Sequence, residues 1–76
     1  MNWDRVAGVW KQYKGSLRAK WGQLTDDDLD VTAGNRQRLI GKIQERYGIA
    51  KGQAEREVRE WERESEEERP RRAGGI

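Results

Sequence analysis

The chain has 76 residues and a mass of 8.9 kDa, which leaves room for one small domain. Hydrophobic residues make up 33% of the chain and charged residues 39%, and the mean hydropathy is −1.24. Such a composition is near the lower limit for burying a stable core. The absence of cysteine and histidine excludes disulfides, thiol nucleophiles and histidine-based metal or acid–base chemistry. We therefore expect no catalytic residue, no cofactor and no metal.

Charge is distributed in blocks of alternating sign, although the formal net charge is only +2. Residues 1–24 and 35–48 are basic, whereas residues 25–34 and 49–69 are acidic. This pattern suits helices that pack against one another better than it suits a surface for a polyanion. No apolar run is long enough to span a membrane, and the first residues lack the layout of a secretory signal, so we expect a cytoplasmic protein without membrane insertion.

The first segment predicts an amphipathic helix that ends near Gly22. Its apolar residues, from Trp3 to Leu24, fall within an arc of about 80° on a helical wheel. Gly8, Gly15 and Gly22 recur at seven-residue spacing on roughly the opposite side. Because glycine inside a helix costs up to about 1 kcal/mol relative to alanine, this helix should depend on its apolar face for order.

Two further helices follow. Thr25 precedes three aspartates, which predicts an N-cap with a capping box, and Gly34 is the expected stop. Asn35 predicts the next N-cap, and Gly48 is expected to be the C-terminal glycine of that helix. Gly41, inside the same helix, suggests a close approach by another element.

The last helix is expected from about Lys51 to about Glu64, with a short apolar stripe and a heavily charged surface. Beyond it, Pro70 should stop any helix. We therefore divide the chain into one helical domain, residues 1–64, and a disordered charged tail, residues 65–76. The expected fold is all-α with four helices.

The stretch TDDDLDVTAGNRQRLIGKIQERYGIAKGQAEREVREWE closely resembles the CsbD-like family of small bacterial stress-response proteins, and the opening MNWDRVAGVWKQYKGSLRAKWGQL is similar to the start of the same family. The resemblance covers about residues 2–62. It implies two roughly orthogonal helical hairpins in a SAM-domain-like arrangement, and induction under general stress. The family has no established molecular activity, so the resemblance supplies no functional residues. Ala50 departs from the family, where Ser or another capping residue is usual, so we expect a softer start to the last helix.

The apolar and aromatic residues of these segments predict the core. Its expected members are Trp3, Val6, Trp10, Tyr13, Leu17, Trp21, Leu24, Leu29, Leu39, Ile40, Ile43, Tyr47, Ile49, Val58 and Trp61. The tryptophans could instead be stacking platforms for nucleic-acid bases. We favour core packing, because few aliphatic residues are available and tryptophan buries a large area.

Lys11, Lys14 and Arg18 share one side of the first helix and form the candidate binding surface. They could contact phosphates, or they could pair with the aspartates of residues 26–30. We favour pairing, because the charge of the chain is balanced. Those aspartates lack the spacing of a calcium loop and are better explained as helix-capping residues.

These observations predict a non-catalytic protein, with hydrophilin-like protection under osmotic or drying stress as the favoured role. Glycine accounts for 9 of the 76 residues and the chain is very hydrophilic, which is typical of hydrophilins. The alternative is a small module that binds protein or nucleic acid through the basic face of the first helix. The partner is unknown, and we expect a monomer rather than a homodimer.

Overall fold

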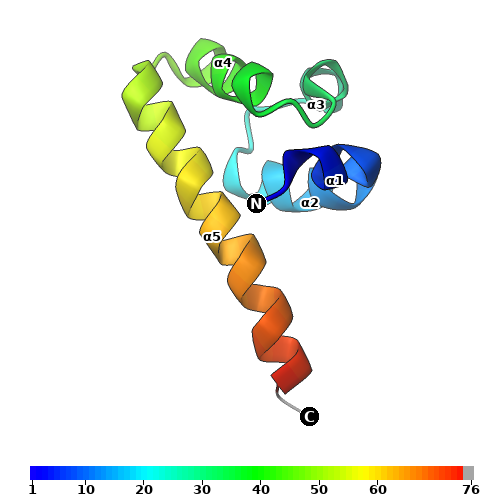
Figure 1. Cartoon of the computed structure of the whole chain (residues 1–76). Coiled ribbons are helices and arrows are strands. Elements are labelled where there is room, and N and C mark those ends of the chain that lie inside the picture. Colours follow the sequence, from blue (N-terminus) through cyan, green and yellow to red (C-terminus); the bar gives the residue numbers. More distant parts are fainter. Residues whose placement is uncertain (75–76) are drawn as a thin grey trace.

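The computed structural model describes residues 1–74, with the side chains of residues 1–66. Within this range the chain forms five helices and no strand: α1 (Trp3–Gly8), α2 (Trp10–Lys20), α3 (Asp26–Thr32), α4 (Arg36–Tyr47) and α5 (Lys51–Gly74). Figure 1 shows α1 and α2 together on one side, α3 and α4 above them, and α5 running steeply past both groups. The prediction of an all-α fold is confirmed.

The predicted first helix is divided in two at Val9, so the described chain has five helices instead of four. Val9 leaves the helical region with φ −125° and ψ 35°, and no side chain caps α2. The Val9 amide donates to the Val6 carbonyl at 3.1 Å, which is the tighter bond of a 3₁₀ turn. Gly8 directly precedes the break, and its low helix propensity together with the β-branched Val9 gives the physical reason.

The helix α3 begins and ends where the sequence predicts. The Thr25 side chain accepts from the Asp28 amide, and the Asp28 carboxylate accepts from the Thr25 amide, which completes the capping box. At the other end the chain turns through Ala33 and Gly34, whose φ angles are 47° and 81°. Only the second of these two residues is of the type that adopts such angles without cost.

Gly34, rather than Gly41, is the site of the close approach. A Cβ atom built on Gly34 would lie 2.5 Å from the Cα and Cβ atoms of Ala7 in α1. A Cβ built on Gly41 would meet nothing within 4 Å, so the prediction for Gly41 is wrong. No other element approaches Gly41, because this residue lies on the exposed side of α4.

The helix α4 has the predicted caps at both ends. The Asn35 side chain accepts from the Arg38 amide at 3.0 Å, and Gly48 closes the helix in the left-handed conformation with φ 64°. A short link then leads to α5, whose first backbone bond runs from the Ala54 amide to the Ala50 carbonyl. As a result, α4 and α5 pack against each other as a hairpin.

The last helix is longer than predicted. It continues past Glu64 and Pro70 to Gly74, so the predicted stop at Pro70 is wrong. Proline has a fixed φ close to the helical value, although it removes one backbone hydrogen bond and its ring crowds the preceding turn. Ser65 and Glu66 belong to α5 instead of the expected tail, and Glu66 forms an ion pair with the amino terminus that favours this extension. Residues 75–76 of the predicted tail lie outside the described residues.

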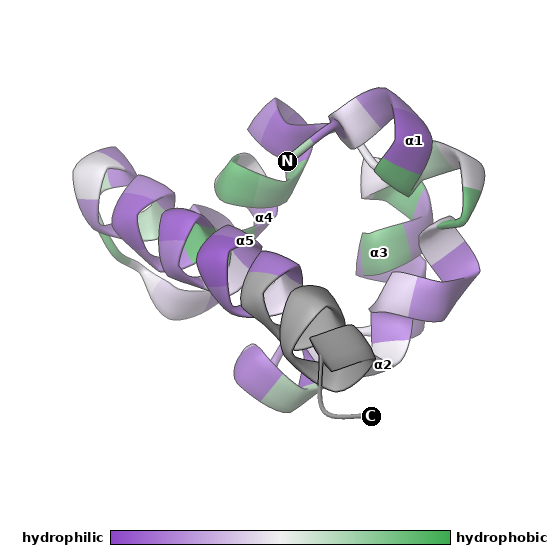
Figure 2. Cartoon of the chain, turned by 60° about the horizontal axis from the view of Figure 1, so that its bottom comes forward, coloured by the Kyte–Doolittle hydropathy of each residue, from purple (hydrophilic) through white to green (hydrophobic). Residues whose placement is uncertain are grey.

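One hydrophobic core joins the helices. Figure 2 shows hydrophobic residues on α3 and α4 and hydrophilic residues over much of α5. Among the side chains of residues 1–66, twelve hydrophobic residues are buried: Val6, Trp10, Leu17, Trp21, Leu24, Leu29, Leu39, Ile40, Ile43, Ala54, Val58 and Trp61. Met1, Trp3, Tyr13, Tyr47 and Ile49 are partly buried against them. Every residue of the predicted core is therefore in one of these two groups, and Met1 and Ala54 are additional.

Candidate functional site

The basic face of α2 is largely engaged by α3. The Lys14 ammonium lies 2.5 Å from the Asp30 carboxylate and 3.8 Å from that of Asp26. Arg18 lies 3.9 Å from the same Asp26 carboxylate. The Lys14 side chain is only 17% exposed, and its hydrogen bond to Asp30 raises the pKa of the ammonium group. Of the three predicted residues, Lys11 alone is exposed without an ion pair to any side chain of residues 1–66.

This arrangement leaves little positive potential for a polyanion. Two of the three cations face carboxylates on the adjacent helix, and those carboxylates would repel a phosphate brought to the same place. The structure thus places two of the three predicted basic residues, Lys14 and Arg18, at a contact between α2 and α3. Their contribution to stability is small, because the aspartates remain more than half exposed.

A second charged cluster surrounds Asp28 and ties α3 to α4. Its carboxylate is 5% exposed and accepts two hydrogen bonds from the Arg46 guanidinium, at 2.8 and 2.9 Å. The Thr25 amide donates at 3.1 Å, and the Lys42 ammonium lies 3.7 Å away. The Arg46 guanidinium, followed by the Thr25 amide, holds the pKa of the Asp28 carboxyl well below its usual range. The contacts of the Asp28 carboxylate therefore serve to cap α3 and to hold it against α4.

The aspartate-rich segment is a helix-capping segment, as the sequence predicts for Asp28. Among the residues whose placement is described, no group of three or more acidic side chains is positioned to hold a metal ion.

All four tryptophans anchor one part of the chain to another through their indole N–H groups. Trp3 donates to Glu62 at 2.6 Å and Trp10 donates to the Leu29 carbonyl at 2.7 Å. In the same way Trp21 donates to Glu57 and Trp61 donates to Ser16, both at 2.9 Å. Buried indoles usually need such a partner, and these bonds together link α1, α2 and α3 to distant segments.

Three of these indoles and Tyr13 also form an aromatic cluster. The ring centroids of Trp3 and Trp61 are 5.8 Å apart, and those of Tyr13 and Trp61 are 5.6 Å apart in an edge-to-face arrangement. Trp3 and Trp10 approach within 6.3 Å. Because the faces of these rings are used in packing, the arrangement is unlike an open platform for stacking bases.

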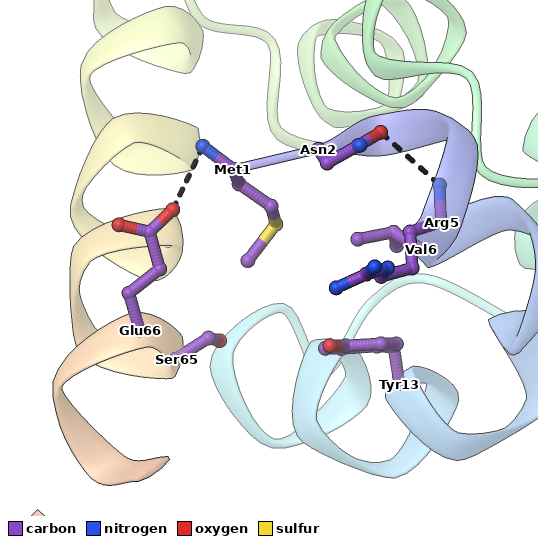
Figure 3. Close-up of a pocket in the computed structure, with 7 residues that line it drawn as sticks. All are labelled: Met1, Asn2, Arg5, Val6, Tyr13, Ser65 and Glu66. Carbon is purple, nitrogen blue, oxygen red and sulfur yellow. Dashed lines mark hydrogen bonds and ion pairs between the residues drawn. The ribbon is translucent and has the colours of Figure 1, made fainter. Parts of the chain in front are cut away.

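A small cavity lies beside this cluster, where α1, α2 and α5 meet. Its volume is about 220 Å³, and its walls are formed by Met1, Asn2, Arg5, Val6, Tyr13, Ser65 and Glu66. Figure 3 shows the Arg5 guanidinium and the Tyr13 hydroxyl directed toward the cavity, with the Met1 side chain facing them. Polar and apolar groups therefore line the same cavity.

The α-ammonium of Met1 is the charged group with the closest partner in the cavity wall. It forms an ion pair with the Glu66 carboxylate at 2.7 Å, and this hydrogen bond raises the pKa of the ammonium group. The Asn2 side chain accepts from the Arg5 amide at 3.2 Å as the N-cap of α1. These two contacts fix the first residues of the chain against α1 and α5.

The sequence does not indicate this cavity. Ser65 and Glu66 fall in the segment expected to be a disordered tail, and Met1 and Asn2 belong to no predicted pattern. The only available signal is the predicted amphipathic face, which places Val6 and Tyr13 on the same side of the first segment. The approach of α5 to this face is a tertiary contact without a local signature.

These features define a small all-helical protein with a densely charged surface, an aromatic core and a cavity beside its amino terminus. The family model of the CsbD-like proteins matches residues 4–56. The chain belongs to the CsbD-like family, a family of general stress-response proteins whose molecular function is uncharacterised.

Several relatives are similar over most of their length. The UPF0337 protein YjbJ of Escherichia coli K12 is 54% identical over 66 residues, which cover 87% of this chain and 96% of the relative. YjbJ of Salmonella typhimurium is 58% identical and covers 82% of this chain and 89% of the relative. A UPF0337 protein of Bordetella pertussis is 62% identical and covers 80% and 92%. None of these names states an activity.

The length and hydropathy of the helices bear on the prediction that the protein does not insert into a membrane. Within residues 1–74, no helix combines the length and the apolar character that crossing a bilayer requires.

Proposed function

We propose that this protein acts without catalysis, as a solvated charged spacer that keeps other macromolecules apart during osmotic or drying stress. The observation that carries the proposal is the contrast between the interior and the exterior. The large apolar side chains are buried or packed against the core, and only Val9 and Val31 are exposed, at 38% and 55%, among the side chains described.

The exterior is charged in both signs. Ion pairs join neighbouring elements, such as Lys20 to Glu60 at 3.5 Å and Arg36 to Glu62 at 3.2 Å. A surface with mixed charges and without a large apolar patch holds water and resists adhesion. Two such surfaces therefore do not associate readily when the protein concentration rises.

Weak helices support the same role. Gly8, Gly15, Gly41 and Gly52 lie in helices, and a Cβ atom added to any of them would meet nothing within 4 Å, so packing does not require glycine at these positions. Gly15 and Gly41, which lie inside their helices, each cost about 0.5–1 kcal/mol relative to alanine. A fold of low stability can loosen and re-form as water is lost and regained.

The test is to dry a labile soluble enzyme with this protein and to measure the activity that returns on rehydration. We expect more activity than with an equal mass of serum albumin. A matched variant replaces exposed charges of both signs, Asp4→Asn, Asp27→Asn, Arg56→Gln and Arg59→Gln, so that the net charge is unchanged.

This variant should keep its circular dichroism spectrum and protect less well than the wild type. Protection by the wild type that is no better than that of albumin would remove the proposal. Equal protection by the variant and the wild type would remove the role assigned to the charged surface.

A further inference from the structure

We infer that the cavity between α1, α2 and α5 is a binding site for a small organic carboxylate with an apolar body. This inference is independent of the proposed surface role, because it concerns one cavity and not the exterior as a whole. It follows from the donors, the charge, the apolar surface and the size of the cavity.

The cavity wall is rich in hydrogen-bond donors. The α-ammonium of Met1, the Arg5 guanidinium, and the hydroxyls of Tyr13 and Ser65 can all donate. The Asn2 side chain uses its oxygen to accept from the Arg5 amide, which leaves its NH₂ group as a further donor. Such a wall is complementary to a ligand that accepts hydrogen bonds.

The charge of the wall favours an anion. The Met1 ammonium and the Arg5 guanidinium are positive, and Glu66 is the one acidic residue of the lining. The Glu66 carboxylate is already paired with the ammonium group at 2.7 Å. Among the side chains of residues 1–66, no carboxylate pairs with the Arg5 guanidinium, which points into the cavity in Figure 3. A guanidinium in this position can bind a carboxylate through two parallel hydrogen bonds.

The apolar part of the wall and the size of the cavity limit the rest of the ligand. Val6, the Met1 side chain and the Tyr13 ring offer apolar surface, and the Tyr13 ring is held in place by its edge-to-face contact with Trp61. A volume of about 220 Å³ corresponds to roughly seven water molecules at about 30 Å³ each. The ligand is therefore about the size of benzoate, and an inorganic anion alone leaves the apolar wall uncovered.

The test uses the full chain labelled with ¹⁵N and follows amide chemical shifts during titration. Benzoate is the probe. Benzamide has the same shape without charge, benzylammonium has the opposite charge, and inorganic phosphate is an anion without an apolar body. We expect saturable shifts at Arg5, Val6, Tyr13 and Ser65 with benzoate, with half-saturation at about 1–10 mM, which is the range for so small a ligand. The three other compounds should bind at least several-fold more weakly.

A pair of variants separates the site from general electrostatics. Arg5→Gln should weaken benzoate binding about tenfold, because it removes the charged donor. Arg38→Gln removes the same charge from an exposed position on α4 that is outside the cavity wall, and should leave binding unchanged. Both side chains are exposed, so both variants should fold, and their spectra check this directly.

Three results would overturn the inference. They are shifts that grow linearly with benzoate concentration, equal shifts with benzamide, and equal weakening by Arg5→Gln and Arg38→Gln. A negative titration would overturn only the binding site and not the proposed protective function. A negative drying experiment would overturn only the protective function and not the binding site.

Discussion

The boundaries of the α3–α4 pair and those of the α1–α2 pair are specified in different ways. The α3–α4 pair has a capping box, a second N-cap and two residues of positive φ before Asn35, so its boundaries are fixed by local contacts. The α1–α2 pair lacks a side-chain cap at the start of α2 and is interrupted at Val9. Its order depends on contacts with α3 and α5. The comparison teaches that a weak helix can be positioned by a few large aromatic anchors.

The largest effect is expected when the principal aromatic anchor is removed. Trp61 is 2% exposed, packs against Trp3 and Tyr13, and donates to Ser16 of α2. Trp61→Ala should lower the free energy of unfolding by about 3–5 kcal/mol, as truncation of a buried aromatic residue does. Urea denaturation followed by circular dichroism measures this loss. Amides of α1 and α2 should lose protection from hydrogen exchange first.

The control for this variant is Val31→Ala, since Val31 is 55% exposed. Its effect should remain within about 0.5 kcal/mol. A loss for Trp61→Ala no larger than for Val31→Ala would contradict the role of the aromatic anchor.

The next effect concerns the contact between the α1–α2 pair and the α3–α4 pair. Gly34→Ala places a methyl group 2.5 Å from the Ala7 backbone at a φ of 81°. Overpacking and backbone strain together should cost about 2–4 kcal/mol. Gly48→Ala is the matched control, because its φ is also positive, at 64°, but its surroundings are open. It should cost only about 1 kcal/mol. Equal losses in thermal or urea unfolding would show that the Ala7 contact is unimportant.

The third prediction concerns acid. The pKa of Asp28 is lower in the folded chain than its ordinary value because Arg46 and Thr25 stabilise the carboxylate. Its stabilising effect is therefore present at neutral pH and declines as the pH falls below about 4. Urea midpoints measured across this range should show a steeper decline for the wild type than for Asp28→Asn. Asp27→Asn, an exposed neighbour, is the control and should keep the wild-type slope. Parallel slopes for the wild type and Asp28→Asn would contradict the assignment.

The smallest effect is a gain in stability. Gly15 in α2 and Gly41 in α4 both have open surroundings. Replacement of either by alanine should raise the free energy of unfolding by about 0.5–1 kcal/mol. If α2 is the less stable helix, Gly15→Ala should also slow hydrogen exchange of its amides more than Gly41→Ala slows those of α4. A loss of stability in either variant would mean that the glycine serves a contact.

Local signals explain what could be predicted from sequence. Thr25, Asn35 and Gly48 act through bonds within a few residues of themselves, so their roles are visible in the chain alone. Periodic spacing similarly locates the core, because a buried stripe repeats with the helix. Pairing of Lys14 with Asp30 follows from the same kind of signal, since two blocks of opposite charge are adjacent in the chain.

The remaining features depend on contacts between distant residues. The break at Val9 and the continuation of α5 past Pro70 escape prediction, because helix propensity and periodicity do not report what packs against an element. The close approach involves Gly34 instead of Gly41, and the sequence does not show which glycine faces another helix. The cavity needs Glu66 to lie beside Met1, and no local pattern joins residues so far apart.

The central claim is that the indoles are internal anchors and not an exposed binding surface. The most direct measurement is hydrogen exchange of the four indole N–H groups by NMR, combined with quenching of tryptophan fluorescence by acrylamide. We predict slow exchange for Trp10, Trp21 and Trp61, somewhat faster exchange for the partly buried Trp3, and weak quenching. Exchange at the rate of free indole in all four, with quenching as strong as in the unfolded chain, would contradict this claim.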